Sequence, residues 1–535
     1  MCGCLTVEEY KYPGRASTNF ISIKLLSLIA LSLPTITAYL CIISTFFTKA
    51  DVISNYSLAN CPDVKSGLPP ISYSIGSWEP QKQFWMFSVI LHLPARMLLT
   101  IVVSQVWKEG IWRLAGFAAA CLEMLGLVCV SLFHVDSIAG FHVHAAFFSL
   151  WVAATIWGMS IIVHMQRVTR QIYHDRKTFR SWIVKILIMC AFILVTCAVS
   201  ITYPLSQIYC SLTAFTAFCI GEYSIIALNA AFWVVVLIEY SKYFDGVQIV
   251  SPSFFLPVKF YGFFALCVPT LTAYVCIIST FYTQADIISN YTLANCPDVK
   301  SNLPPISYAI GSWEPQRQLW LFAVIIHLPS RMLLTRMIPQ IWREGIWRLA
   351  GYGAASLEMF SLVMVSLFHV DSIAGFETHA TFFSLWWAAT VWGMSIVIHM
   401  QRVTGHINQD PFIYRSWLIK IALMTAFIIV SCAVSISYPL SQRYCSLPAF
   451  IIFCLGEYAI VGLNSAFWAV VLIEFNRDFE GFRFVSVRKG KSGRVIPVMP
   501  PLPIECKDKG TFSHEKSPIA RCGGQQKNVV ILPDQ

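Results

Sequence analysis

Long apolar segments recur along the chain and are separated by short polar segments. In the N-terminal half, the apolar runs cover residues 21–47, 84–106, 112–133, 145–165, 183–204 and 213–239. An α-helix rises about 1.5 Å per residue, so each run is long enough to cross a hydrocarbon core of about 30 Å. The pattern therefore predicts six membrane-spanning helices in this half.

The second half of the chain repeats the first at an offset of 235 residues. For example, NCPDVKSGLPPISY from Asn60 is matched by NCPDVKSNLPPISY from Asn295, and more than half of the aligned positions are identical. Because six is an even number, both copies start and finish on one side of the membrane and are parallel, unlike inverted repeats. The predicted domains are an N-terminal segment at 1–20, repeat 1 at 21–245, a linker at 246–253, repeat 2 at 254–482 and a tail at 483–535.

Composition excludes a soluble globular protein. The 535 residues are 56% hydrophobic and 12% charged, whereas a soluble domain carries about 25% charged residues. The predicted fold class is therefore an all-α polytopic membrane protein with two parallel six-helix transmembrane bundles and about twelve spans. Much of the net charge of +10 lies in short loops and the tail, so it indicates membrane orientation, and we expect no nucleic-acid partner.

Basic residues flank the spans on one side and predict that this side is cytosolic. In repeat 1 they are Lys11, Arg15, Lys24, Lys108, Arg113, Arg167, Arg170, Arg176, Lys177 and Arg180. Both termini are then cytosolic, and we expect the polar, basic tail at 483–535 to be disordered.

The opposite, lumenal loops contain sequons and cysteines in matching positions. Asn55 and Asn290 each begin a glycosylation sequon, so both are predicted glycosylation sites. In an oxidising lumen, we expect disulfides between the first and last lumenal loops of each repeat, with free thiols as the alternative. The predicted pairs are Cys61–Cys210 and Cys296–Cys445.

Ionisable residues inside the spans are the strongest indication of a functional site, because a charge at a helix centre is costly. His92 and Arg96 lie four residues apart in the second span, on one helical face, with Pro94 between them. The third span contributes Glu123 and the sixth contributes Glu222. Helical rise places these side chains in the lumenal half or near the midplane, so we expect one polar cluster. Repeat 2 has the same set in His327, Arg331, Glu358 and Glu457.

Two interpretations of this cluster stay open. In the structural one, Arg96 pairs with Glu123 or Glu222 and holds helices together. In the functional one, a lumen-facing cavity binds an anionic head group such as a phosphodiester, because the guanidinium donates parallel hydrogen bonds to phosphate. The substrate-binding residues are then Arg96, Glu123, Arg331 and Glu358, and the catalytic residues that exchange protons are His92, Glu222, His327 and Glu457.

A metal centre is not predicted. The third lumenal connection carries His134, Asp136 and His144, with counterparts His369, Asp371 and His379, but this spacing supplies no certain third ligand. No P-loop, dinucleotide fingerprint, G-x-S-x-G elbow or H-E-x-x-H motif occurs in structural context, so we expect no cofactor.

The lumenal string resembles a known family. Cys61-Pro62, Leu68-Pro69-Pro70-Ile71-Ser72, Ile75-Gly76 and Glu79-Pro80-Gln81 are followed by Trp85, His92 and Pro94-Ala95-Arg96, and the last span carries Glu222-Tyr223 and Asn229. These residues are similar to the post-GPI attachment to proteins factor 2 family, which is also described as the N-terminal domain of a fungal cell-wall protein that exchanges lipid on GPI anchors. The resemblance covers almost all of each repeat.

The resemblance implies a Golgi or ER membrane protein that is needed for fatty-acid remodelling of GPI anchors. The implied partners are GPI-anchored proteins or GPI lipid, membrane lipids and other remodelling enzymes. It leaves open whether the protein is itself an acyltransferase-type catalyst or an accessory factor. The alternative functions are a lipid transporter or scramblase, and a non-catalytic membrane scaffold.

Overall fold

The computed structural model describes most of both repeats. The described residues are 20–54, 57–58, 61–105, 110–137, 139–168, 175–241, 245–250, 256–257, 261–289, 292–293, 296–337, 345–371, 374–403, 410–478, 481–489 and 495–497. Within these ranges, twelve helices are long and apolar enough to cross a membrane, at the positions that the apolar runs predict. The predicted all-α, twelve-span fold is confirmed, while the cytosolic orientation of the termini stays a prediction.

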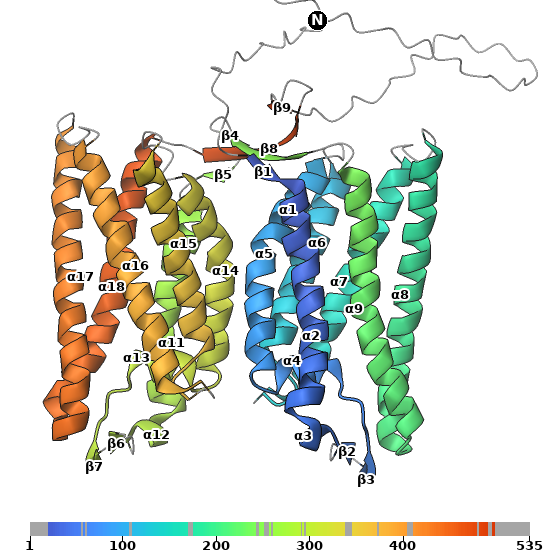
Figure 1. Ribbon diagram of the computed structural model, residues 1–535, viewed down its shortest axis with the longest axis horizontal. Coiled ribbons are helices and arrows are strands. Elements are labelled where there is room, and N and C mark those ends of the chain that lie inside the picture. Colours follow the sequence, from blue (N-terminus) through green and yellow to red (C-terminus); the bar gives the residue numbers. More distant parts are fainter. Residues whose placement is uncertain are drawn as a thin grey trace, which may run out of the picture. The chain divides into compact units, whose positions relative to one another are not determined.

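Repeat 1 is a bundle of six spans (Figure 1). The first span is continuous through α1 (Ile23–Ser27), the π-helical segment η1 (Leu28–Ser32) and α2 (Leu33–Thr48). The others are α5 (Gln81–Gln105), α6 (Ile111–Leu132), α7 (Gly140–Val168), α8 (Arg176–Ile208) and α9 (Leu212–Tyr240). Pro34 has no N–H and its ring crowds the carbonyl four residues earlier, which accounts for the wider turn that precedes it.

Repeat 2 follows the same order. Its first span combines η3 (Phe263–Cys267) with α11 (Val268–Thr283). The remaining spans are α14 (Gln316–Met337), α15 (Ile346–Leu367), α16 (Gly375–Val403), α17 (Pro411–Tyr444) and α18 (Leu447–Asp478).

Small elements close one end of each bundle, which we call the disulfide end (Figure 1). In repeat 1 they are α3 (Ala50–Ser54), the pair β2 (Ser57–Leu58) and β3 (Cys61–Lys65), and α4 (Ile71–Gly76). In repeat 2 they are α12 (Ala285–Ser289), β6 (Thr292–Leu293), β7 (Cys296–Lys300) and α13 (Ile306–Gly311).

A small antiparallel sheet lies at the opposite end of the helices, which we call the terminal end (Figure 1). Its strand order is β1 (Phe20–Ser22), β4 (Gly246–Val250), β8 (Gly481–Lys489), β5 (Leu256–Pro257), with β9 (Val495–Pro497) on β8. Strands β4 and β8 are counterparts in the duplicated sequence, and they pair with each other. Strand β4 lies in the predicted linker, and strands β8 and β9 lie at the beginning of the tail that is expected to be disordered. Residues 498–535 lie outside the described residues.

Aromatic side chains fill the interior of each bundle. Phe192 of α8 and Phe215 and Phe232 of α9 are fully buried, and so are their counterparts Phe427, Phe450 and Phe467. On its outer face, α8 presents Leu187, Leu194 and Ile201, which are 63%, 70% and 58% exposed. Their spacing of seven residues makes one apolar stripe, the surface that a lipid-facing helix needs.

Candidate functional site

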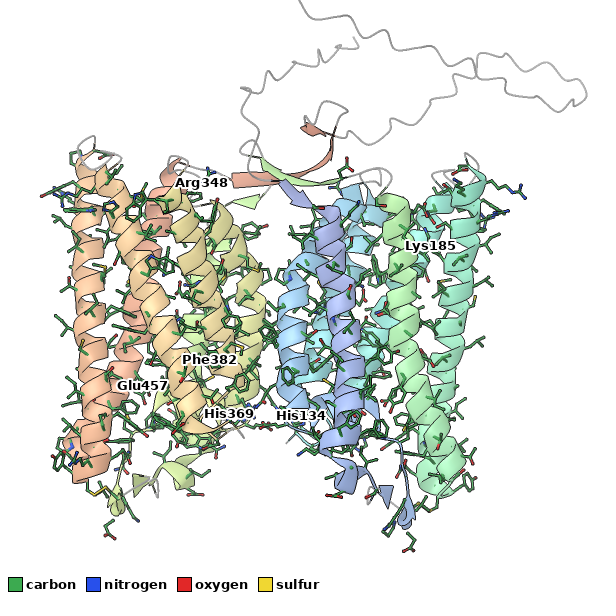
Figure 2. All side chains as sticks on the ribbon, viewed as in Figure 1. His134, Lys185, Arg348, His369, Phe382 and Glu457 are labelled. Atoms are coloured by element: carbon green, nitrogen blue, oxygen red, sulfur yellow. A yellow bond between two sulfur atoms is a disulfide. The ribbon has the colours of Figure 1, made fainter. Side chains whose placement is uncertain are left out.

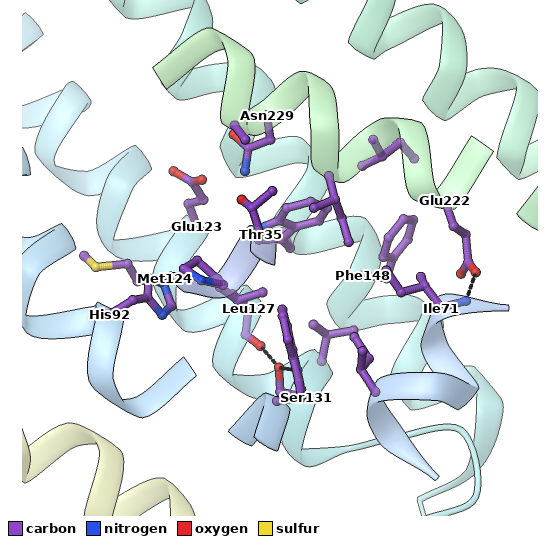
Figure 3. A pocket seen from close by; sticks show the side chains of 18 of the residues that line it. Thr35, Ile71, His92, Glu123, Met124, Leu127, Ser131, Phe148, Glu222 and Asn229 are labelled. Carbon is purple, nitrogen blue, oxygen red and sulfur yellow. Dashed lines mark hydrogen bonds between the residues drawn. The ribbon is translucent and has the colours of Figure 1, made fainter. Parts of the chain in front are cut away.

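A cavity that is partly open to the outside lies in repeat 1 (Figure 3), and its space, including the open mouth, is about 1090 Å³. Its walls come from η1, α2, α4, α5, α6, α7 and α9, whereas α8 contributes no lining residue. His92, Arg96, Glu123 and Glu222 all line it, so the four polar residues singled out in the sequence surround one space. Most of the remaining wall is apolar and includes Leu31, Phe148, Trp151 and Ile225.

Arg96 and Glu123 form a buried ion pair across α5 and α6. The Arg96 Nη2 donates to Glu123 Oε1 at 2.7 Å, and both side chains are less than 10% exposed. The guanidinium carbon also lies 4.1 Å from the ring centroid of Trp233 on α9, a cation–π contact. An arginine carries five N–H donors, so this pairing leaves donors for a further acceptor.

His92 lies one turn before Arg96 on the same face of α5. Its Nδ1 is 3.3 Å from the Ser88 carbonyl oxygen, which can only accept, so Nδ1 carries the proton. The basic lone pair is then on Nε2. His92 can therefore accept a proton from a group in the cavity.

Glu222 holds the small helix α4 against α9. Its Oε2 accepts from the backbone N–H of Ile71 at 2.9 Å, and its Oε1 accepts from the Ser72 hydroxyl at 3.3 Å. The next residue, Tyr223, donates its hydroxyl to the Pro69 carbonyl. These are the contacts of a helix cap. Figure 3 shows Glu222 and His92 on opposite sides of the cavity, and the catalytic role predicted for Glu222 stays a prediction.

Two polar atoms in the cavity wall have no hydrogen-bond partner among the described residues. They are Asn229 Oδ1 and Trp233 Nε1, both buried, and the same two atoms are unpartnered in Asn464 and Trp468 of repeat 2. Unpaired buried polar groups are costly, so they indicate a place where a polar ligand group can bind.

Repeat 2 reproduces the polar contacts. Arg331 Nη2 donates to Glu358 Oε1, and His327 Nδ1 lies 3.1 Å from the Ala323 carbonyl oxygen. Glu457 caps α13 through the Ile306 N–H at 2.9 Å. The guanidinium of Arg331 differs from that of Arg96, because its carbon lies 5.9 Å from the Trp468 ring centroid.

Both predicted disulfides are confirmed. Cys61 joins Cys210, and Cys296 joins Cys445, so each disulfide ties the β3 or β7 strand to the turn between the last two spans. The predicted glycosylation sites Asn55 and Asn290 lie outside the described residues.

The sequence reasoning missed a second buried ion pair near the terminal end of repeat 1. Lys185 of α8 donates to Glu239 of α9 at 2.6 Å and to the Gln166 side-chain oxygen at 2.8 Å, and Ser181 donates to Glu239 at 2.7 Å. Lys185 is completely buried. It lies toward the terminal end of the bundle, whereas His134 lies near the disulfide end (Figure 2). The sequence feature that could have indicated this pair is the presence of Lys185 inside the predicted span 183–204.

Near the disulfide end, His134 and His369 are buried and neutral. Burial and the Lys82 ammonium lower the pKa of His134 to about 3, and burial with Arg317 does the same to His369. The His134 Nε2 accepts from Lys82 Nζ at 2.7 Å, and this neutral ring forms no charge pair with Glu314, whose carboxylate is 4.0 Å away. No group of three or more His, Cys, Asp or Glu in the described ranges is arranged to hold a metal ion.

The Frag1/DRAM/Sfk1/Cwh43P N-terminal domain model matches the chain twice, at residues 22–243 and 260–477. The chain belongs to this family. Each match coincides with one six-span bundle, so the protein carries the family domain in tandem.

Three relatives show how the family domain maps onto this chain. "Post-GPI attachment to proteins factor 2" of Drosophila melanogaster is 28% identical over 221 residues, which are 41% of this chain and 85% of that protein. The protein of the same name from Drosophila pseudoobscura pseudoobscura is 32% identical over 164 residues, covering 29% and 62%. "Acyltransferase PGAP2" of Xenopus tropicalis is 21% identical over 228 residues, covering 41% and 89%. No solved structure gives a significant match.

Proposed function

We propose that this protein takes part in the fatty-acid remodelling of GPI anchors in a Golgi or ER membrane, as catalyst or as accessory factor. The observation that carries the proposal is the repeat 1 cavity, which places Arg96 and His92 in an otherwise largely apolar space inside the membrane-spanning bundle. A GPI lipid needs both kinds of surface, since it joins a phosphodiester head to acyl chains. The names of the relatives from Drosophila and Xenopus support the assignment.

In this proposal, the phosphoinositol head binds Arg96, and the remaining acyl chain lies along the apolar wall near Leu31, Phe148 and Ile225. Arginine suits phosphate because its planar fork donates parallel hydrogen bonds. Glu123 fixes the orientation of the guanidinium, and Trp233 covers its face. The free sn-2 hydroxyl of a lyso-GPI then lies at about the same membrane depth as Arg96.

His92 has the proton role in this proposal. Its Nε2 lone pair takes the proton of the sn-2 hydroxyl as that oxygen bonds to an acyl carbonyl carbon, and the protonated ring then returns a proton to the leaving group of the acyl donor. The donor is an activated acyl ester or thioester. If the protein is accessory, Arg96 and its surroundings present the lyso-lipid to a separate acyltransferase.

A pair of matched reporters tests the proposed function. Cells lacking the protein would express one extracellular domain either with a GPI anchor or with a transmembrane anchor, and flow cytometry would measure both at the surface. We expect altered surface abundance of the GPI-anchored reporter alone, restored by the wild-type chain. Equal behaviour of the two reporters, with normal anchor lipid, would contradict the proposal.

A further inference from the structure

The two repeats offer nearly the same residues for a lipid site. Each residue that lines the repeat 1 cavity has a counterpart 235 positions later, and the counterparts are identical except at two positions. Val461 stands at the position of Ile226, and Ser465 stands at the position of Ala230. The first difference removes one methylene group, whereas the second adds a hydroxyl group.

The added hydroxyl makes a specific contact. Ser465 of α18 hydrogen-bonds to the Thr270 hydroxyl of α11, and the Thr270 hydroxyl also donates to the Leu266 carbonyl at 2.8 Å. Since one hydroxyl cannot donate twice with one hydrogen, Ser465 donates to Thr270. The bond joins the first and last spans of repeat 2.

The equivalent place in repeat 1 is the wall of the cavity. Thr35 and Ala230, the counterparts of Thr270 and Ser465, both line the open space. An alanine has no hydroxyl group, so this position cannot join α2 to α9 as Ser465 joins α18 to α11. In repeat 2 the serine thus adds a hydrogen bond between two helices at a position that in repeat 1 lines the cavity.

The cavity found in the second bundle overlaps the equivalent site only in part, around the Arg331–Glu358 ion pair and Trp468. This cavity, whose space including its open mouth is about 570 Å³, is also lined by Thr335 and Leu472. Thr335 follows Arg331 on α14, which leads away from the disulfide end, so this cavity extends from the ion pair toward the terminal end. The guanidinium position also differs between the repeats. The guanidinium carbon of Arg331 lies 5.9 Å from the Trp468 ring centroid, whereas that of Arg96 lies 4.1 Å from the Trp233 ring centroid.

We infer that the two repeats have different roles: the repeat 1 cavity binds a single-chain anionic phospholipid, and the Ser465–Thr270 bond closes the equivalent site in repeat 2. Repeat 2 then keeps Asn464 Oδ1 and Trp468 Nε1, which are unpartnered among the described residues, for a small polar group, but it does not bind that lipid. The lipid class rests on the proposed function, but the asymmetry rests on the contacts of Thr270, Ser465 and Ala230.

Photolabelling of the purified full chain tests the inference directly. The probe is a photoactivatable lysophosphatidylinositol in detergent micelles, and peptide mass spectrometry assigns the label to α9 or α18. For wild type we expect label in α9 and little in α18. Ser465→Ala should raise the α18 label about fivefold, the change in an equilibrium that one net hydrogen bond makes. Ala230→Ser should lower the α9 label by a similar factor.

Matched controls separate the site from general effects of the substitutions. Ala227→Ser changes an exposed alanine on the same helix as Ala230, and Ser435→Ala removes a hydroxyl that bonds only within α17. Both should label as wild type. Equal wild-type label in α9 and α18, or no response to Ser465→Ala in the folded protein, would overturn the asymmetry.

The same experiment distinguishes failure of this inference from failure of the proposed function. If only α9 is labelled, but loss of the protein leaves GPI anchors normal, the difference between the repeats would stand and the GPI assignment would be rejected. Absence of label from both repeats would overturn the inference, whatever the anchors show. A neutral photoactivatable monoacylglycerol that labels α9 as strongly would reject the anionic head group, and with it the inferred ligand class.

Discussion

Arg96 donates to Glu123 across 2.7 Å in the interior of repeat 1, and neither side chain is more than 10% exposed. This pair joins α5 to α6 and forms part of the cavity wall. The pair therefore holds two helices together and also contributes to the proposed binding site. A single substitution would disturb both roles.

A double substitution separates the structural role of the Arg96–Glu123 pair from its binding role. Arg96→Met alone should destabilise the folded protein by about 3–5 kcal/mol, because it leaves the Glu123 carboxylate buried without its partner. Arg96→Met with Glu123→Gln removes both charges and should recover most of the thermal stability measured in detergent. The double variant should still fail to restore normal GPI anchors in cells lacking the protein. Full rescue by a stable double variant would show that the pair is structural only.

The second ion pair should behave differently. Lys185→Met leaves Glu239 buried and uncompensated, so we expect a loss of about 3–5 kcal/mol, and Lys185→Met with Glu239→Gln should restore most of it. Because this pair lies outside the cavity lining, the double variant should keep its function. Thermal unfolding in detergent measures the first effect, and cell rescue measures the second. Lys177→Met, at an exposed position on the same helix, is the control and should change neither.

Loss of the first disulfide should lower the yield of folded protein. Cys61→Ser releases β3 from the turn after α8, and removing such a cross-link typically costs about 2–5 kcal/mol. Non-reducing electrophoresis should show a mobility change between wild type and variant that disappears with reductant. The matched control is Cys190→Ser, which replaces an exposed free cysteine. Identical mobility of the wild type with and without reductant would contradict the bridge.

Acidic pH should destabilise the protein through His134 and His369. Their pKa values are lowered to about 3 in the folded state, whereas an unfolded histidine titrates near 6.5. The unfolded chain therefore binds more protons below about pH 6.5, and stability falls from there toward pH 3. Melting temperatures in detergent at pH 7.5 and 5.0 should show the fall, and His134→Gln with His369→Gln should reduce its size. An unchanged pH dependence in that variant would rule out these histidines as the cause.

The sequence predicts the spans, the duplication and the disulfides because each depends on local or repeated signals. Apolar runs of about 20 residues are sufficient to locate the helices, and the equivalent cysteines lie in loops on one predicted side. Helical depth places His92, Arg96 and Glu123 at similar levels, but their meeting at one cavity depends on the packing of α5 against α6. The spans, the duplication and the disulfides need no knowledge of how the helices pack.

Packing decides the features that the sequence does not reveal. The capping role of Glu222 depends on the placement of Ile71, which is 151 positions away in the chain, at the N-terminus of α4. The partner of Lys185 is on another helix, and hydropathy gives no indication of which carboxylate it meets. The contact between Ser465 and Thr270 needs two helices at opposite ends of a repeat to lie side by side.

Lipid mass spectrometry of GPI anchors tests the central proposal most directly. Anchors would be purified from cells lacking this protein, and from the same cells rescued with wild type or with Arg96→Met/Glu123→Gln. We predict lyso-GPI or unsaturated anchors in the cells without the protein, normal saturated anchors after rescue with wild type, and no correction by the double variant. An anchor profile unchanged by loss of the protein would contradict a role in GPI-anchor remodelling.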